Sequence, residues 1–188
     1  MEELKKYISQ IAVQSDEDWA FFSSELTKAY FPKKSILLKK GQIENHISFV
    51  KKGSLRLHIP EMDKDATFGF VFENEFISAY DSFLTQTPSY YQIETLTDTV
   101  LWQITRIHLE EVYRKTTNGN SVGRKIAENH FLLKSKREYS LLNLTPEQRY
   151  LNLFAERPKL IKQIPLKYIA SYIGVTPQAL SRIRSRIS

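Results

Sequence analysis

The chain has 188 residues, of which 41% are hydrophobic and 26% are charged, an ordinary balance for a globular protein. It contains no cysteine, which excludes disulfides, thiolate nucleophiles, thiolate zinc sites and cysteine-ligated iron–sulfur clusters. No apolar run approaches the ~20 residues of a membrane span, and the first ten residues have no signal-peptide core. We therefore expect no membrane partner and a cytoplasmic location.

Positive charge is concentrated in the last segment. The chain carries 27 Lys and Arg against 21 Asp and Glu, a net charge of +6. Residues 146–188 hold eight basic and two acidic residues, so this segment carries the whole excess. A basic segment joined to a neutral one is typical of proteins that bind a polyanion. The segment lacks the strongly amphipathic, aromatic face of a membrane-surface helix, whereas charge alone leaves RNA open.

Two short helices and a series of strands are predicted in the first 104 residues. Residues 2–13 place Leu4, Ile8 and Ile11 on one side of a helix, and Ser15 begins a second helix that reaches toward Pro32. Short apolar runs then alternate with turn residues, at 36–38, 46–50, 55–59, 66–72, 76–79, 91–96 and 99–104. This spacing favours an antiparallel barrel or jelly roll.

A helical pattern returns after Thr105. A short helix is predicted over 107–115, followed by a break at 118–120 and one long helix over 121–142. Its seam has spacings of three and four residues and includes Val122, Ile126, Asn129 and Leu133. Such a mixed seam either lies on the barrel or forms a two-fold dimer contact in which Asn129 sets the register.

The last 44 residues predict helices that end in a helix-turn-helix. Thr145, Pro146 and Gln148 give a capped helix start. In the motif, Leu166 to Ser188, apolar positions share faces on either side of Gly174: Leu166, Ile169, Ala170 and Ile173 before it, and Val175, Leu180 and Ile183 after it. Glycine allows a sharp turn with positive φ, and Thr176 with Pro177 gives a second helix start.

The outward face of the second helix carries chemistry that suits double-stranded DNA. Glutamine can bind adenine bidentately, arginine can bind guanine, and further cations can bind phosphates. The candidate DNA-binding residues are Thr176, Pro177, Gln178, Ser181, Arg182, Arg184 and Arg186. The alternative is an ordinary helical hairpin with solvated arginines. The register of the apolar positions, the small Ala170 and the turn glycine favour DNA.

The order of these elements, together with four motifs, resembles the CRP/FNR family, the relatives of cyclic-AMP receptor protein. The motifs are the glycines Gly41 and Gly53 around an apolar strand, residues 74–77, residues 144–149 and the helix-turn-helix at 166–185. The resemblance implies an α+β fold: an antiparallel β-roll with N-terminal helices (1–118), a long dimerisation helix (119–143) and a helix-turn-helix domain (144–188). It further implies a homodimeric transcription regulator, not an enzyme, with RNA polymerase as a further candidate partner.

The chain departs from the cyclic-AMP-binding members where they hold the nucleotide. Those members use a glutamate for the ribose and an arginine for the phosphate, whereas the aligned positions here are Ser78–Ala79 and Ser89–Tyr90. No Lys or Arg occurs between Lys64 and Arg106. A buried phosphate needs charged partners to offset its desolvation. We therefore expect a degenerate cassette that does not bind cyclic AMP, and the identity of any effector is unknown.

The corresponding pocket candidates are mainly aromatic. They are Phe70, Phe72, Phe76, Ser78, Ala79, Tyr80, Phe83, Ser89, Tyr90 and Tyr91. Their aromatic rings either simply fill the roll, the interpretation we favour, or surround an apolar or aromatic effector. The four histidines, His46, His58, His108 and His130, show no metal-ligand spacing, so no metal site is expected.

The family usually follows its recognition helix with a β-hairpin wing that contacts the DNA backbone. The sequence ends at Ser188, directly after that helix, so we expect no wing and backbone contacts from Arg184, Arg186 or the segment around Lys159 and Lys162. The preferred function is therefore a homodimer that recognises an inverted repeat through the helix at 176–186.

Two alternatives remain open. One is a small-molecule-binding or cupin-type β-roll protein with an incidental basic tail, which would need clustered His and Glu ligands. The other is a regulator without ligand control that is governed by its abundance.

Overall fold

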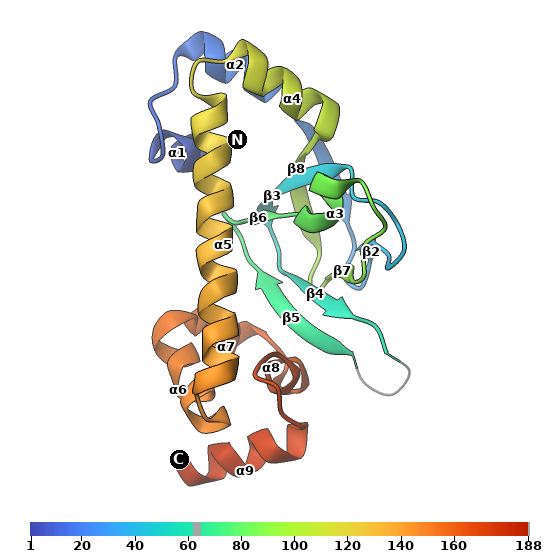
Figure 1. Cartoon of the computed structure of the whole chain (residues 1–188), viewed down its shortest axis with the longest axis vertical. Coiled ribbons are helices and arrows are strands. Elements are labelled where there is room, and N and C mark those ends of the chain that lie inside the picture. The colour runs from blue at the N-terminus through green and yellow to red at the C-terminus, as the bar shows by residue number, and fades with distance from the viewer. Residues whose placement is uncertain (62–64, 188) are drawn as a thin grey trace.

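A computed structural model describes residues 1–61 and 65–187; Lys64 and Ser188, which bound two of the sequence-based predictions, lie outside the described residues. A long helix runs beside a β-roll and ends among four shorter helices (Figure 1). None of the described helices is both long and apolar enough to cross a membrane.

The β-roll consists of two antiparallel four-stranded sheets, with strand orders β1-β8-β3-β6 and β2-β7-β4-β5. The strands are β1 (Thr27–Phe31), β2 (Ile36–Leu38), β3 (His46–Lys52), β4 (Leu55–Ile59), β5 (Ala66–Val71), β6 (Phe76–Ile77), β7 (Gln92–Thr95) and β8 (Thr99–Thr105). Apolar side chains of both sheets, among them Val50, Leu55 and Leu101, form the core between them. The predicted α+β fold with an antiparallel roll is confirmed.

A glycine is required where β3 turns into β4. Gly53 has a φ of +107°, and a Cβ atom there would lie 2.6 Å from the Thr99 hydroxyl and 2.7 Å from the Asp98 carbonyl oxygen. Both the backbone conformation and the close approach of the next strand therefore exclude a side chain.

Two elements of the β-roll differ from the prediction. The helical region does not extend to Pro32, because Thr27–Phe31 pairs with β8 as the edge strand β1. Helix α3 (Tyr80–Thr85) follows β6 directly, where no helix was predicted. Strand β1 has no buried residue and α3 is only six residues long, so neither leaves a clear periodic pattern in the sequence.

The N-terminal helices hold the long helix against the roll. They are α1 (Glu2–Ser9) and α2 (Asp16–Ser24), with α4 (Arg106–Lys115) leading into the long helix α5 (Gly119–Asn143). Leu4 and Ile8 of α1 are buried with Phe49 of β3 and Val122 of α5. The long helix predicted over 121–142 is confirmed, and its first turns are fixed by this small core.

The C-terminal helices form a second core that includes part of the roll. They are α6 (Pro146–Glu156), α7 (Pro158–Gln163), α8 (Leu166–Tyr172) and α9 (Pro177–Ile187). Thr145 and Gln148 form the predicted reciprocal capping box at the start of α6. Phe70 and Phe72, at the end of β5, are buried among the apolar side chains of these helices. The β-roll and the C-terminal helices therefore share one continuous apolar cluster.

Candidate nucleic-acid interface and effector cavity

The turn between α8 and α9 has the geometry that the sequence predicts. Gly174 has a φ of +76°, and the next amide, that of Val175, donates to the Ala170 carbonyl at 2.9 Å. Thr176 then begins α9, its hydroxyl accepting the Ala179 amide at 3.1 Å. The left-handed glycine reverses the chain direction and the threonine cap satisfies a free helix amide, so the two helices are held at a defined angle.

The inner faces of α8 and α9 are almost completely buried. Ile169, Ala170, Leu180 and Ile183 belong to the C-terminal core, as predicted. Leu166 does not, because it lies in the first turn of α8, beyond that core, and is 43% exposed. Its assignment to the buried face was wrong, but the faces that pack against each other are those the sequence indicated.

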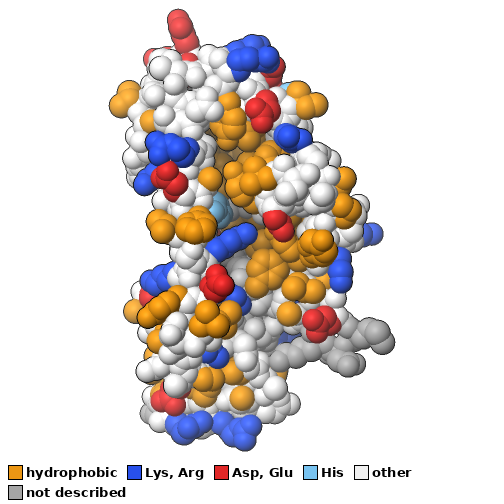
Figure 2. All heavy atoms as spheres, in the orientation of Figure 1, with side chains coloured by type: hydrophobic (Ala, Val, Ile, Leu, Met, Phe, Trp, Pro, Cys, Tyr) orange, Lys and Arg blue, Asp and Glu red, His pale blue; other side chains and the backbone are white. Residues whose placement is uncertain are grey.

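The outer face of α9 is exposed, basic and free of carboxylates along its own length. All seven predicted DNA-binding residues are exposed, from Thr176 to Arg186. Helix α9 lies at the end of the molecule, away from the β-roll (Figure 1), and Figure 2 shows Lys and Arg side chains gathered at that end. This arrangement presents amide, hydroxyl and guanidinium groups together on one surface of a helix.

Specific polar contacts attach α8 to the β-roll, and sequence reasoning missed them. The Ser171 hydroxyl donates to the Asp65 carbonyl at 2.9 Å and accepts the Thr67 amide at 2.8 Å. The Tyr172 ring packs on Phe70, with ring centroids 5.4 Å apart. Strand β5 therefore gives the helix-turn-helix both hydrogen bonds and apolar contact.

A buried ionic cluster lies directly beneath this contact. Arg56, only 4% exposed, bonds to Asp65 at 2.7 Å and Glu94 at 2.5 Å, and its guanidinium lies 4.1 Å from the Tyr168 ring centroid of α8. His58 Nδ1 lies 3.2 Å from the Asp65 carboxylate without hydrogen-bond geometry. Burial, and then the charge of Arg56, lower the pKa of His58, and the two carboxylates oppose this. The only sequence signal was an arginine within an alternating apolar strand.

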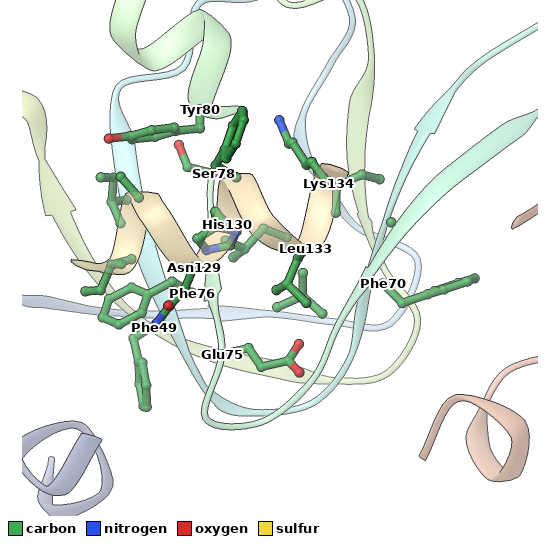
Figure 3. A pocket seen from close by; sticks show the side chains of 18 of the residues that line it. Phe49, Phe70, Glu75, Phe76, Ser78, Tyr80, Asn129, His130, Leu133 and Lys134 are labelled. Atoms are coloured by element: carbon green, nitrogen blue, oxygen red, sulfur yellow. The ribbon is translucent and has the colours of Figure 1, made fainter. Parts of the chain in front are cut away.

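A cavity of about 920 Å³ is lined by residues of the β-roll, of α5 and of the C-terminal helices. We call it the central cavity. Its roll side includes Phe49, Phe70 and Phe76, and its helix side includes Asn129, His130, Leu133 and Lys134 (Figure 3). Figure 2 shows the corresponding hollow between the long helix and the roll, with hydrophobic side chains along it. The volume lies within the range of small-molecule sites.

The chain is similar in sequence and fold to known proteins. The sequence model of the cyclic nucleotide-binding domain matches residues 28–116. No curated protein sequence matches the chain.

Solved structures extend the likeness beyond this domain. FixK2 from Bradyrhizobium japonicum has a TM-score of 0.75 at 14% identity, with 86% of this chain and 84% of that chain covered. The c-di-GMP-responsive global regulator CLP of Xanthomonas campestris has a TM-score of 0.69 at 14% identity, with 92% and 91% covered. A protein from Eubacterium rectale described as a CRP/FNR-family regulator has 0.67 at 16%, with 92% and 83% covered. The predicted resemblance to CRP/FNR regulators is confirmed in the fold.

Only five of the ten predicted pocket residues lie at the central cavity. Phe70, Phe76, Ser78, Tyr80 and Tyr91 line it. The other five candidates lie elsewhere: Phe72 is in the C-terminal core, Ala79, Phe83 and Ser89 are buried within the roll, and Tyr90 is 77% exposed. The aromatic side chains of this domain thus have mixed roles, some lining the cavity and others filling cores.

The cassette positions of the domain make local contacts. The Ser78 hydroxyl donates to the His46 carbonyl at 2.8 Å, and the Ala79 amide donates to the buried Glu44 carboxylate at 3.3 Å. The Ser89 hydroxyl donates to the Tyr91 carbonyl at 2.9 Å. The side chains at these positions carry no charge.

The first part of the predicted seam of α5 faces the roll, whereas Leu133 at its end is 65% exposed. Val122 is buried against α1 and β3, Ile126 packs on the same core, and Asn129 and Leu133 line the central cavity. Other large apolar side chains of α5 are 62–78% exposed: Phe131, Leu132, Tyr139 and Leu142. Between Leu132 and Leu142 the exposed positions recur at helical spacing, a signal that the sequence analysis missed.

Proposed function

We propose that the chain is a homodimeric transcription regulator that recognises an inverted DNA repeat through α9. The observation that carries the proposal is the exposed, basic, acid-free outer face of a helix that follows a left-handed glycine turn. In a two-fold dimer, Gln178, Ser181 and Arg182 would contact base edges of half-sites about one helical turn apart. Arg184 and Arg186 would contact phosphates, and RNA polymerase is a further candidate partner.

The exposed apolar side chains of α5 support the dimer. Leu132, Tyr139 and Leu142 lie on α5, which is 25 residues long. Exposed apolar positions at helical spacing favour pairing with a second helix, because pairing removes their surface from water. The division into a sensor domain (1–118), a dimer helix (119–143) and a DNA-binding domain (144–188) follows from this assignment.

We further propose that cyclic AMP is not the effector. The side chains at Ser78–Ala79 and Ser89–Tyr90 offer neither a carboxylate for a ribose nor a cation for a phosphate, and the Ser78 and Ser89 hydroxyls already donate to backbone carbonyls. Calorimetry of the full chain with cyclic AMP should detect no binding. Saturable binding at micromolar concentration would contradict this part of the proposal.

Selection of duplexes from a randomised DNA pool at near-physiological salt tests the main proposal. A homodimer that recognises base edges should enrich an inverted repeat with half-site centres about 10 bp apart. Enrichment of single half-sites would remove the dimer from the proposal. General binding that only weakens with salt would show that α9 contacts phosphates without recognising sequence.

A further inference from the structure

Two helices end close together beside the turn of the helix-turn-helix. Helix α5 ends at Asn143 and helix α8 ends at Tyr172, and the lower end of α5 lies among the C-terminal helices (Figure 1). A Cβ atom at Gly174 would lie 3.6 Å from the Leu141 side chain, so the end of α5 reaches the turn itself. The last carbonyls of a helix lack partners within the helix and carry partial negative charge, so two such ends repel each other unless donors lie between them.

The Arg149 guanidinium supplies donors to both helix ends at once. Its Nε donates to the Ile173 carbonyl, at the end of α8, at 2.8 Å. Its Nη1 donates to the Leu144 carbonyl at 2.6 Å and to the Leu141 carbonyl at 3.4 Å, both at the end of α5. A guanidinium presents its N–H donors in a rigid planar fork, so this bridge fixes the direction of one helix relative to the other.

A second arginine reaches the end of α8 from α5 itself. Arg137 donates to the Tyr172 carbonyl at 3.0 Å, and its guanidinium lies 4.8 Å from the centroid of the Tyr172 ring. The carbonyls of Tyr172 and Ile173 are the last two before Gly174. Both therefore accept hydrogen bonds from arginines that lie outside the helix-turn-helix.

Both arginines bond to these carbonyls rather than to carboxylates. Each side chain is partly buried, and among residues 1–61 and 65–187 neither forms an ion pair. Hydrogen bonds from a charged donor are stronger than neutral ones, and partial exclusion of water strengthens them further. Helix α5 is therefore joined to the turn before α9 by side-chain contacts as well as by the intervening chain.

We infer that Arg149, supported by Arg137, is a positioning residue that fixes the spacing of the DNA half-sites which the proposed dimer accepts. The inference rests on the proposed function, in which α5 carries the dimer contact and α9 the DNA contact. Each added base pair moves a half-site by about 3.4 Å and turns it by about 34° around the duplex axis. A dimer whose recognition helices are fixed relative to α5 can follow neither change, whereas a dimer with a loosened contact between α5 and α8 tolerates several spacings.

Fluorescence anisotropy with three duplexes tests this role: the selected inverted repeat, and the same repeat with one base pair added or removed between its half-sites. The wild type should bind the selected spacing at least about tenfold more tightly than either neighbour, the size of one lost base contact. Arg149→Met should bring the three affinities within about threefold of one another, because the fork between the two helix ends is lost. Thr145→Ala removes the cap of the same helix α6 without removing a donor to α8, and should keep the wild-type ratio. A merely structural role of Arg149 would weaken all three duplexes alike.

A distance measurement without DNA separates the positioning of α9 from DNA recognition. The chain contains no cysteine, so Ser121→Cys on α5 and Ser185→Cys on α9 give two unique, exposed sites for spin labels. Pulsed electron paramagnetic resonance on the full labelled chain, diluted with unlabelled chain, measures the distance between the two helices within one chain. The distance distribution should be narrow, should broaden with Arg149→Met and should stay narrow with Thr145→Ala. Circular dichroism checks the helix content, and if Arg149→Met unfolds, Arg149→Lys, which keeps the charge without the fork, takes its place.

A spacing preference that the Arg149 variant leaves intact would overturn the inference, as would an unchanged distance distribution. In either case an inverted repeat enriched by the wild type would leave the proposed function standing. If the wild type enriches no inverted repeat, the proposed function fails and the spacing role fails with it. A broadened distance distribution would then still support the positioning of α9 by Arg149.

Discussion

Two arginines on the same exposed helix have different expected roles in DNA recognition. Arg182 lies beside Ser181 and within reach of Gln178 along the outer face of α9, whereas Arg186 lies in the last turn. Arg182→Ala should cost about 1–3 kcal/mol on the selected duplex and little on random DNA, because a base contact is lost. Arg186→Ala should weaken both duplexes alike and reduce the salt slope by about 1.

Fluorescence anisotropy with both duplexes across a salt series measures these two effects. Ser185→Ala provides a control on the same helix, since among the described residues the Ser185 hydroxyl bonds only to the helix backbone at Ser181. Identical losses on specific and random DNA for both arginine variants would refute the division of roles.

The buried side chain of His58 should make the free energy of unfolding depend on pH. Its pKa is lowered below 6.5 by burial and by Arg56, despite Asp65 and Glu94. Above pH 6.5 the imidazole is neutral in both states; as pH falls, the unfolded state takes up the proton first, and this favours unfolding. The free energy of unfolding should therefore decrease between pH 7.5 and the lowered pKa.

Urea unfolding at several pH values checks this expectation. His58→Gln keeps a polar side chain beside Gln92 and should flatten the decrease, leaving the contribution of His130, whose pKa is also lowered. An unchanged pH slope in His58→Gln would show that other groups account for the whole effect.

Among the elements, the proposed role of α5 as the dimer helix can be tested. Replacing both Leu132 and Leu142 with glutamate would place charges on the exposed apolar positions. The double substitution should convert the proposed dimer into monomers, because the dimer contact would bury these charges without a partner. Sedimentation at micromolar concentration measures the mass directly. Leu84→Glu on α3 changes another exposed leucine, which lies on the roll and is 56% exposed, and should leave the dimer intact. A dimer that survives the double substitution would place the contact elsewhere.

Elements were predictable where the sequence alternates in chemistry or carries a helix cap. The strand at 55–59 alternates apolar and polar residues although its first four residues are all buried, and Thr145 carries a capping box. The exposed outer face of α9 was also predictable. The apolar residues that pack on the core identify one face of the helix, and the opposite face is then left in solvent. The central cavity was not predictable, because the residues that line it depend on how α5 is rotated about its axis against the roll. Val122 and Ile126 pack on the N-terminal core, which is one of the two placements that the sequence left open for this seam.

At the scale of the whole molecule, Ser171 joins the two halves. Ser171→Ala would leave the Thr67 amide without its acceptor and should cost about 1–3 kcal/mol in the free energy of unfolding. Both tryptophans lie outside the C-terminal helices, Trp19 in α2 and Trp102 in β8, so their fluorescence follows the roll and its N-terminal helices while circular dichroism follows all helices. The two transitions should coincide in the wild type and separate in the variant, as cooperativity is lost. Coincident transitions at an unchanged midpoint would argue against this coupling.

The position of Phe70 and Phe72 has a consequence for dissecting this protein. Strand β5 is the last strand of its sheet, and these two aromatic side chains are covered by the C-terminal helices rather than by another strand. A fragment expressed without those helices would expose two aromatic side chains on an unpaired edge strand. Such a surface promotes edge-to-edge aggregation. The sensor half is therefore a poor candidate for crystallisation in isolation, and pairing Phe70→Ser with Phe72→Ser would be the natural solubilising change.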